Sequence, residues 1–300
     1  ATGIGSAEAI DTAVVTLSFS NTTNAVQVIN TLVGGLTVSG TNAGPGAVNI
    51  TETAGNLTVG ASDITTNSGA VTLTASAANA DIISALNSDI VTTGGPTAGA
   101  AVTLQADNID LAGLITAGTG LVTLRPNADA VAIQVGATAA DGVATLGITD
   151  AELDRITTIG GVTIGSTTNT GGITVVGAAD QATGATITGG TFTLRSNSGP
   201  IVVNAALSNA VDTTLQTTSG NISFGAAGAV TAATKVVTLS AAGGNIEGHV
   251  AALTNVTAAT LNATASTGIG ATNALETSVV TLSATNTGAT GNISIVEAND

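Results

Sequence analysis

Three acidic residues and an arginine lie close together near the middle of the chain. Asp150, Glu152 and Asp154 alternate along the stretch TDAELDRI, and Arg155 follows directly. Carboxylates at this spacing could supply oxygen ligands to Ca²⁺. The nonapeptide repeat that binds calcium in some β-helical proteins does not occur in the sequence. We therefore interpret the stretch as a solvated turn with a local carboxylate–arginine pair, and we predict no metal site.

The single histidine, His249, lies two residues after Glu247 in the segment EGHVA. Nucleophilic catalysis needs a carboxylate, an imidazole and a nucleophile in one place, and no such grouping can be recognised here. Carbohydrate-active sites use clustered carboxylates, whereas the 19 acidic residues are spread thinly and Trp and Tyr are absent. We expect no enzyme activity and no catalytic residues; a carbohydrate-active β-helix enzyme stays open as an alternative.

Nothing in the sequence indicates a cofactor site. Gly-x-Gly patterns occur at Gly3–Gly5, Gly44–Gly46 and Gly268–Gly270, but the chain has 39 glycines and none of the three patterns continues into a phosphate-binding GK[ST] motif. The absence of Cys removes disulfides and thiolate metal sites. We therefore predict no cofactor-binding residues and no cofactor.

The charge and hydropathy of the chain exclude further classes of function. Its net charge is −15, and its four basic residues provide no footprint for nucleic acid. A hydrophobic content of 43% and a mean hydropathy of +0.50 argue against disorder. The apolar runs are far shorter than the roughly 20 residues that span a bilayer, so we expect no membrane insertion.

Polar residues form two further patterns. Thr-x-Thr pairs such as Thr72/Thr74, Thr186/Thr188 and Thr191/Thr193 could bind ice if they were stacked in register. The pairs do not recur in every unit, so a Thr-ladder ice-binding protein, which thermal hysteresis would test, is kept as an alternative. Seven N-x-[ST] sequons would carry glycans in a source that glycosylates Asn; they lie at Asn21, Asn49, Asn56, Asn221, Asn255, Asn262 and Asn292.

Short alternations of apolar and polar residues dominate the chain, and such alternation is typical of strands with one buried face. The segments with this pattern are 14–18, 70–74, 101–105, 121–125, 192–196, 236–240, 259–263 and 279–283. Only 149–156 has a helical signal, because Thr149 and Glu152 form a capping-box pattern. We expect a single helical turn or a loop there.

The spacing of leucines in these segments defines the fold class. Steps of 21, 24, 22 and 21 separate Leu194, Leu215, Leu239, Leu261 and Leu282, and steps of 20 and 22 separate Leu104, Leu124 and Leu146. The step of 31 from Leu73 to Leu104 indicates an insertion near 94–99. Such a period in a strand-rich chain predicts an all-β parallel β-helix, a β-solenoid with about 20–24 residues per coil. Propellers and immunoglobulin-like domains need longer repeats and more aromatics than the three Phe present.

A second, longer period is superimposed on the first. GIGSAEAIDTAVVTLS at 3–18 returns as GIGATNALETSVVTLS at 268–283, with ten of sixteen positions identical. VQVINT at 26–31 aligns with ISIVEA at 293–298 after a shift of two residues. We expect 1–267 to be one full long repeat of a continuous solenoid and 268–300 to be the start of the next, without a separate domain.

These repeats resemble the shaft of large bacterial adhesins of the filamentous-haemagglutinin type. The resemblance is carried by the two GIG segments, by the run from DAELDRI to GGITV at 150–175, and by the GxVTL units. It implies a right-handed parallel β-helix, secretion and display at the cell surface. The NPN motifs of that family's secretion domain do not occur, so this chain would be shaft.

The resemblance and the repeats lead to one functional expectation. The chain is predicted to be a structural module of an extracellular, cell-surface fibre. Its expected partners are identical modules placed end to end, as a tandem chain or a polymer, with host or neighbouring cells contacted through regions outside this sequence.

Overall fold

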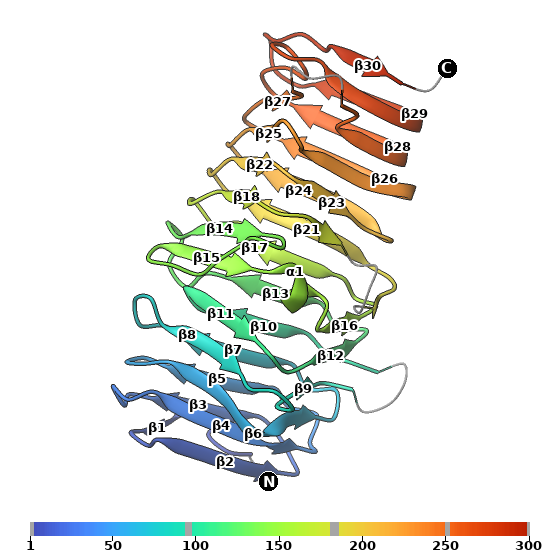
Figure 1. Cartoon of the computed structure of the whole chain (residues 1–300). Helices are drawn as coiled ribbons and strands as arrows, with labels where there is room; N and C mark the ends of the chain where they lie inside the picture. Colours follow the sequence, from blue (N-terminus) through green and yellow to red (C-terminus); the bar gives the residue numbers. More distant parts are fainter. Residues whose placement is uncertain (1–2, 94–97, 181–185, 250–252, 299–300) are drawn as a thin grey trace.

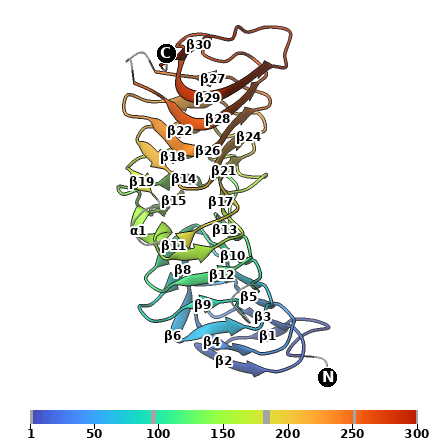
Figure 2. The ribbon, with the colours of Figure 1, turned by 90° about the vertical axis from the view of Figure 1, so that its right-hand side faces the viewer.

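The chain forms a right-handed parallel β-solenoid of about 12 turns, with about 23 residues per turn and almost no helix. The computed structural model describes residues 3–93, 98–180, 186–249 and 253–298. Turns stack from the N-terminal to the C-terminal end of an elongated column, and the two ends of the chain lie at opposite ends of it (Figures 1 and 2). The predicted fold class is confirmed.

Three parallel sheets form the walls of the column. The first has 15 strands: β1 (Ile10–Thr12), β3 (Val26–Asn30), β5 (Val48–Glu52), β7 (Val71–Ala75), β10 (Val102–Gln105), β13 (Val122–Arg125), β17 (Val162–Gly165), β19 (Ala179–Asp180), β21 (Thr191–Ser196), β23 (Ala206–Ser208), β24 (Asp212–Thr217), β26 (Ala229–Ala241), β28 (Val256–Ala265), β29 (Leu275–Asn286) and β30 (Ile295–Glu297). The second has nine strands: β2 (Thr16–Asn21), β4 (Leu36–Asn42), β6 (Leu57–Thr66), β8 (Asp81–Ser84), β9 (Ile90–Val91), β11 (Asn108–Leu111), β12 (Ile115–Gly118), β16 (Ile156–Thr158) and β20 (Thr186–Ile187). The third has six strands: β14 (Ala132–Val135), β15 (Thr145–Ile148), β18 (Ile173–Val175), β22 (Ile201–Val203), β25 (Ile222–Phe224) and β27 (Ile246–Glu247).

Inward side chains of the first sheet stack in columns, one residue per turn. One column runs through Ile10, Val28, Ile50, Leu73, Leu104, Leu124, Ile164, Leu194, Leu215, Leu239, Ala263 and Ala284. Most of these side chains are fully buried. Because strand neighbours lie about 4.8 Å apart, each branched side chain packs directly on the one below it, and a narrow core needs few aromatics.

The leucine spacing predicts this column only in part. The step of 31 is confirmed, because Leu73 pairs with Leu104; residues 94–97 of the predicted insertion lie outside the described residues. Leu261 and Leu282 belong to the neighbouring column instead, because Val237 pairs with Leu261, two positions away from Leu239. Here the leucine spacing differs from the structural register by two positions.

The prediction that Leu146 continues the column after Leu124 is wrong. Leu124 pairs with Ile164, which lies far beyond Leu146 along the chain. Leu146 belongs to β15, in the third sheet, where it pairs with Ile133 of β14. The strand order is reversed at this point, since β15 contacts β11 and lies below the earlier strand β14 in Figure 1. The chain therefore steps back by one level before it resumes its ascent.

The segments 3–18 and 268–283, called the two GIG landmarks below, have the same local structure. Ile4 and Ile269 each form an isolated bridge to the following coil, with Val26 and Ile293 respectively. The four glycines around them have positive φ angles, which L-residues rarely adopt. Ile10 pairs with Val28, and Leu275 pairs with Ile295, which confirms the two-residue shift in the sequence alignment.

Hydrogen bonds between the landmark and the next coil are also repeated. Thr12 Oγ1 donates to Asn30 Oδ1 at 2.9 Å, and Thr277 Oγ1 donates to Glu297 Oε2 at 2.9 Å. The backbone N–H two residues after each threonine donates to the same two side chains, at 2.9 and 3.1 Å. Residues 30 and 297 are thus structural equivalents despite their different side chains.

The two landmarks are nevertheless rotated about the axis relative to each other. The column that contains Ile10 ends at Ala284. In the second landmark, Leu275 lies two residues before Thr277. Thr277 belongs to a different column, which also contains Val256, Val230 and Leu207. Both columns cross the single long strand β26, at Val230 and Leu239, so they lie at different points of one turn. The segment between the two landmarks therefore does not contain a whole number of turns.

Candidate functional site

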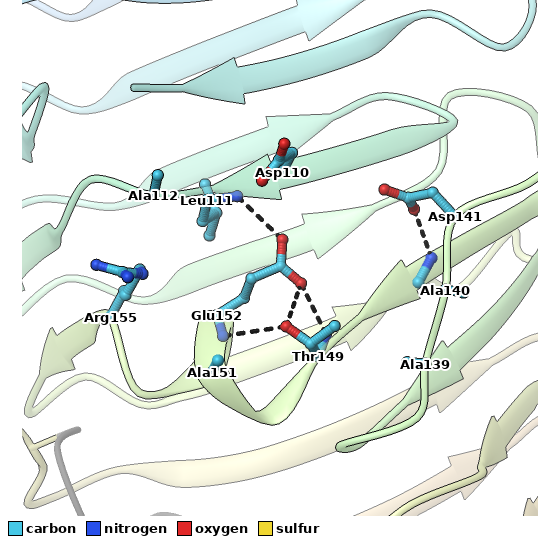
Figure 3. A pocket seen from close by; sticks show the side chains of 11 residues that line it. Asp110, Leu111, Ala112, Ala139, Ala140, Asp141, Thr149, Ala151, Glu152 and Arg155 are labelled. Atoms are coloured by element: carbon cyan, nitrogen blue, oxygen red, sulfur yellow. Dashed lines mark hydrogen bonds between the residues drawn. The ribbon is translucent and has the colours of Figure 1, made fainter. Parts of the chain in front are cut away.

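A side pocket forms where the strand order is reversed. Its volume is about 410 Å³, and it is lined by α1 (Asp150–Leu153), the loop before β15 and the end of β11. Asp110, Asp141 and Glu152 bring three carboxyl groups to its wall, and Arg155 lies on the far side of Glu152 from Asp141 (Figure 3). The pocket exists because the backward step carries β15 and α1 over β11.

Helix α1 is held by the capping box that the sequence predicts. Thr149 is the N-cap, its side chain accepts from Glu152 N, and Glu152 Oε2 accepts from Thr149 N at 2.7 Å. The other carboxylate oxygen, Oε1, accepts from the backbone N–H of Leu111 at 2.9 Å. Glu152 therefore ties the helical turn to the neighbouring strand.

Burial changes the chemistry that was predicted for the acidic stretch. Glu152 is only 8% exposed, so the prediction of a solvated turn is wrong for this residue. Burial raises the pKa of the Glu152 carboxyl group, although the hydrogen bonds from Thr149 and Leu111 oppose this effect. Burial also raises the pKa of Asp150, which accepts from Asp180 N at 2.8 Å.

Asp141 also has a pKa well above the ordinary value for an aspartate. Desolvation of its carboxyl group against the pocket wall raises the pKa from 3.8 to about 6, and a hydrogen bond from Gly147 N at 2.7 Å acts in the opposite direction. The residue as a whole keeps an exposed surface, so the group can exchange protons with solvent. Sequence reasoning missed Asp141, whose only local signal is a polar turn in AADGVA.

The carboxyl groups of the pocket are held in place by the backbone. Glu152 and Asp141 each accept hydrogen bonds from backbone N–H groups, which gives them a structural role. No group of three or more His, Cys, Asp or Glu side chains within the described part of the chain could hold a metal ion. The described residues also include no helix long and apolar enough to cross a membrane.

Glu247, the acidic residue near His249, is bonded to a neighbouring coil. Glu247 Oε2 accepts from the backbone N–H groups of Thr272 and Asn273 at 3.0 and 3.1 Å, and Oε1 accepts from Asn245 Nδ2 at 3.0 Å. These bonds fix the turn after the second GIG landmark. The carboxylate of Glu247 is therefore used to join two successive coils.

Two of the seven sequons are buried. Asn21 is 7% exposed and its amide donates to Asn24 O and Asn42 Oδ1, while Asn255 is 0% exposed and donates to Gly228 O. Neither amide can accept a glycan in the folded state. The sequons at Asn56, Asn221, Asn262 and Asn292 are exposed.

Outward threonines form a longer column than the sequence indicates. An unbroken ladder runs through Thr72, Thr103, Thr123, Thr163, Thr193, Thr214 and Thr238. The Thr-x-Thr pairs themselves do not stay in register, because the column beside this ladder contains Thr74, Gln105, Arg125, Gly165, Arg195 and Gln216. The side chain of Thr186 lies outside the described residues. This face therefore has one threonine column, flanked by a column that contains arginine.

The fold places the chain in the class of parallel β-solenoids and is compatible with a repeat of a solenoid adhesin. No family model, curated protein or solved structure matches the chain significantly.

Proposed function

We propose that the chain is a structural shaft module of a secreted bacterial cell-surface fibre or giant filamentous adhesin, in which identical modules stack head to tail. The β-solenoid fold is compatible with a structural repeat module. The observation that carries the proposal is the different environment of the two GIG landmarks.

Residues of the first landmark are exposed where their equivalents in the second landmark are buried. Ile10 and Val14 are 44% and 38% exposed, whereas Leu275 and Val279 are 0% and 8% exposed. The second landmark lies on β27 and β28, and no described coil lies beneath the first. Full burial of one such aliphatic side chain is worth about 1.5–3 kcal/mol. A preceding copy of 246–265 would bury the first landmark in the same way.

The hydrogen bonds beneath the second landmark define the expected junction. Ile246 N donates to Gly268 O at 3.0 Å, Gly270 N donates to Ile246 O at 2.7 Å, and Asn255 N donates to Glu276 O at 2.8 Å. The corresponding atoms of the first landmark are Gly3 O, Gly5 N and Asp11 O. In our proposal they bond to residues 246 and 255 of the preceding module.

The composition fits an extracellular shaft. The chain contains no Cys or Met, so the sulfur oxidation that affects exposed proteins has no target. The polar outer surface is built from Thr, Ser and Asn, and the partners that we propose are identical modules. Adhesion to cells would reside in regions outside this sequence.

A chain that contains two full modules tests the proposal. Residues 1–267 would be followed by residues 3–300 of a second copy, so that Gly3 takes the place of Gly268, and the rods would be imaged by electron microscopy beside the single module. A repeat of about 265 residues at about 23 per turn and about 4.8 Å per turn adds roughly 55 Å. We expect one straight rod longer by that length. Two rods joined by a hinge would contradict stacking.

Matched substitutions at the junction distinguish stacking from simple linkage. In the two-module chain, Ile10→Asp in the second copy places a charge at the junction position equivalent to Leu275, whose side chain is 0% exposed, and we expect a bend or a protease-sensitive site there. Val15→Asp in the second copy introduces the same charge at the position equivalent to Val280, whose side chain is 87% exposed, and the rod should stay straight. Equal behaviour of the two variants would refute the junction.

Protease treatment of intact source cells tests the surface location, because a shaft outside the cell is cleaved and an internal protein is not.

A further inference from the structure

Two of the three arginines lie on the same face of the solenoid, in the outward column beside the threonine ladder. Arg125 follows Leu124, which pairs with Ile164, and Gly165 pairs with Arg195. The column therefore reads Arg125, Gly165, Arg195 on three successive turns. The backbones of Arg125 and Arg195 are therefore two turns apart, or about 10 Å. The turn between them carries Gly165, which has no side chain.

Gly165 leaves a hollow between the two arginines. Its φ angle is +88°, and an added Cβ would lie 2.2 Å from Arg195 O, so glycine is required here. The hollow has a volume of about 300 Å³ and is lined by both arginines and by the hydroxyl residues Thr163 and Thr167, among others. None of the described residues that line it carries a carboxylate.

The two guanidinium groups are held by neutral partners. Arg125 Nη2 donates to Gln105 Oε1 at 2.6 Å, on the turn below, and Arg195 Nη2 donates to Gln216 Oε1 at 2.8 Å, on the turn above. Within the described residues neither arginine forms an ion pair with a carboxylate. In addition, Arg195 Nε is buried and has no hydrogen-bond partner in the part of the chain that the structure describes.

Two neighbouring arginines without carboxylate partners among the described residues are unusual in a chain with a net charge of −15. A buried donor without an acceptor is costly, and most such groups in folded proteins are satisfied. Acidic residues outnumber basic ones by 19 to 4, yet both arginines border a hollow whose described lining has no acids. The arrangement retains two positively charged arginines in the lining of one small hollow, and one of them also has a buried N–H group without an acceptor among the described residues.

We propose that this hollow binds a tetrahedral oxyanion, namely a sulfate or phosphate group, between Arg125 and Arg195. Guanidinium groups present several N–H donors in a plane and bind such anions by short, charge-assisted hydrogen bonds. A tetrahedral anion has enough oxygens to accept from two guanidinium groups and from threonine hydroxyls at once. The site goes beyond the shaft function, because it gives the side of the rod a ligand of its own.

The chain offers a direct spectroscopic test. It has only three arginines, so the side-chain Nε–H region of a ¹⁵N–¹H spectrum contains three signals, from Arg125, Arg155 and Arg195. The intact chain would be titrated separately with sodium sulfate and sodium phosphate, with sodium chloride at matched ionic strength as the reference. We expect saturable shifts at Arg195 and Arg125 with at least one oxyanion, whereas Arg155 follows the chloride reference. Identical, unsaturating drifts of all three signals would overturn the proposal.

Substitutions then assign the site. Arg195→Gln should weaken binding of the preferred oxyanion at least about ten-fold, because it removes charge-assisted hydrogen bonds. Lys235→Gln removes the same charge from an exposed position in β26 and should leave the affinity unchanged. Should Arg195→Gln fail to fold, Arg125→Gln provides the same comparison. Unchanged affinity in a folded arginine variant, or an equal loss in Lys235→Gln, would refute the site.

Discussion

Buried polar side chains fasten one coil to the next, and Glu152 shows how. Its carboxylate accepts from the N-cap of its own helical turn and from Leu111 on another coil. The capping half of this arrangement could be predicted from the sequence because Thr149 and Glu152 are three residues apart. The bond to Leu111 could not be, because it depends on the reversed order of β14 and β15. The same reversal positions Asp141, in the loop before β15, at the wall of the pocket.

Asp141 allows a prediction of pH dependence. Its folded-state pKa of about 6 lies above the ordinary value of 3.8, so the folded chain retains this proton over a range in which the unfolded chain releases it. The stability that the proton contributes is therefore fully present below about pH 4 and is lost as the pH rises to about 6. NMR of the side-chain carboxyl carbon should give a midpoint near 6.

Asp141→Asn supplies the control for this titration. The amide oxygen can still accept from Gly147 N, but the side chain no longer ionises. The difference in urea midpoint between the parent and the variant should change between pH 4 and 6 and be constant above that range. A difference that is constant from pH 4 to 8 would show that Asp141 is not desolvated.

Stacked columns are the source of stability at the scale of strands. The leucine period predicted the class of fold because one inward residue per turn repeats at nearly constant spacing. It could not predict the shift by two residues between Leu239 and Leu261 or the long step from Leu124 to Ile164. Both depend on where a coil bulges or turns back, and residues inside a turn have no periodic signal.

A single truncation in the column tests this view of stability. Leu124→Ala leaves a cavity at a fully buried position between Leu104 and Ile164, and we expect a loss of about 2–5 kcal/mol in the free energy of unfolding. Leu114→Ala, at a position 47% exposed, should cost less than about 1 kcal/mol. Chemical denaturation measures both. Similar losses at the two positions would show that the column does not dominate stability.

At the scale of the whole molecule, the solenoid is an elongated column, and in the proposed shaft its side surface would repeat with each module. Neighbouring coils contact one another through parallel strands, so order can be extended along the axis without new kinds of contact. In the proposed shaft, the rotation between the two GIG landmarks would turn each module relative to the one before it.

The single lysine of each module makes this rotation measurable. Lys235 is exposed, and a chain of three modules would carry three such lysines, one per repeat. Electron microscopy of rods with electron-dense labels on these amines should show successive labels on different sides of the rod. Labels aligned along one side would mean that each module contains a whole number of turns.

The same rotation limits how a long rod can engage a flat, multivalent surface. In the proposed shaft, sites that recur once per module, such as the hollow between Arg125 and Arg195, would point in a new direction in each successive module. A planar array of ligands can then reach only the fraction of sites that faces it, and the others stay available to a second surface. The spacing of simultaneously engaged sites is accordingly longer than one module, and avidity for a plane is lower than a count of the sites suggests. A solenoid whose repeat does not contain a whole number of turns is therefore suited to connecting two surfaces, because its binding sites face in different directions around its axis.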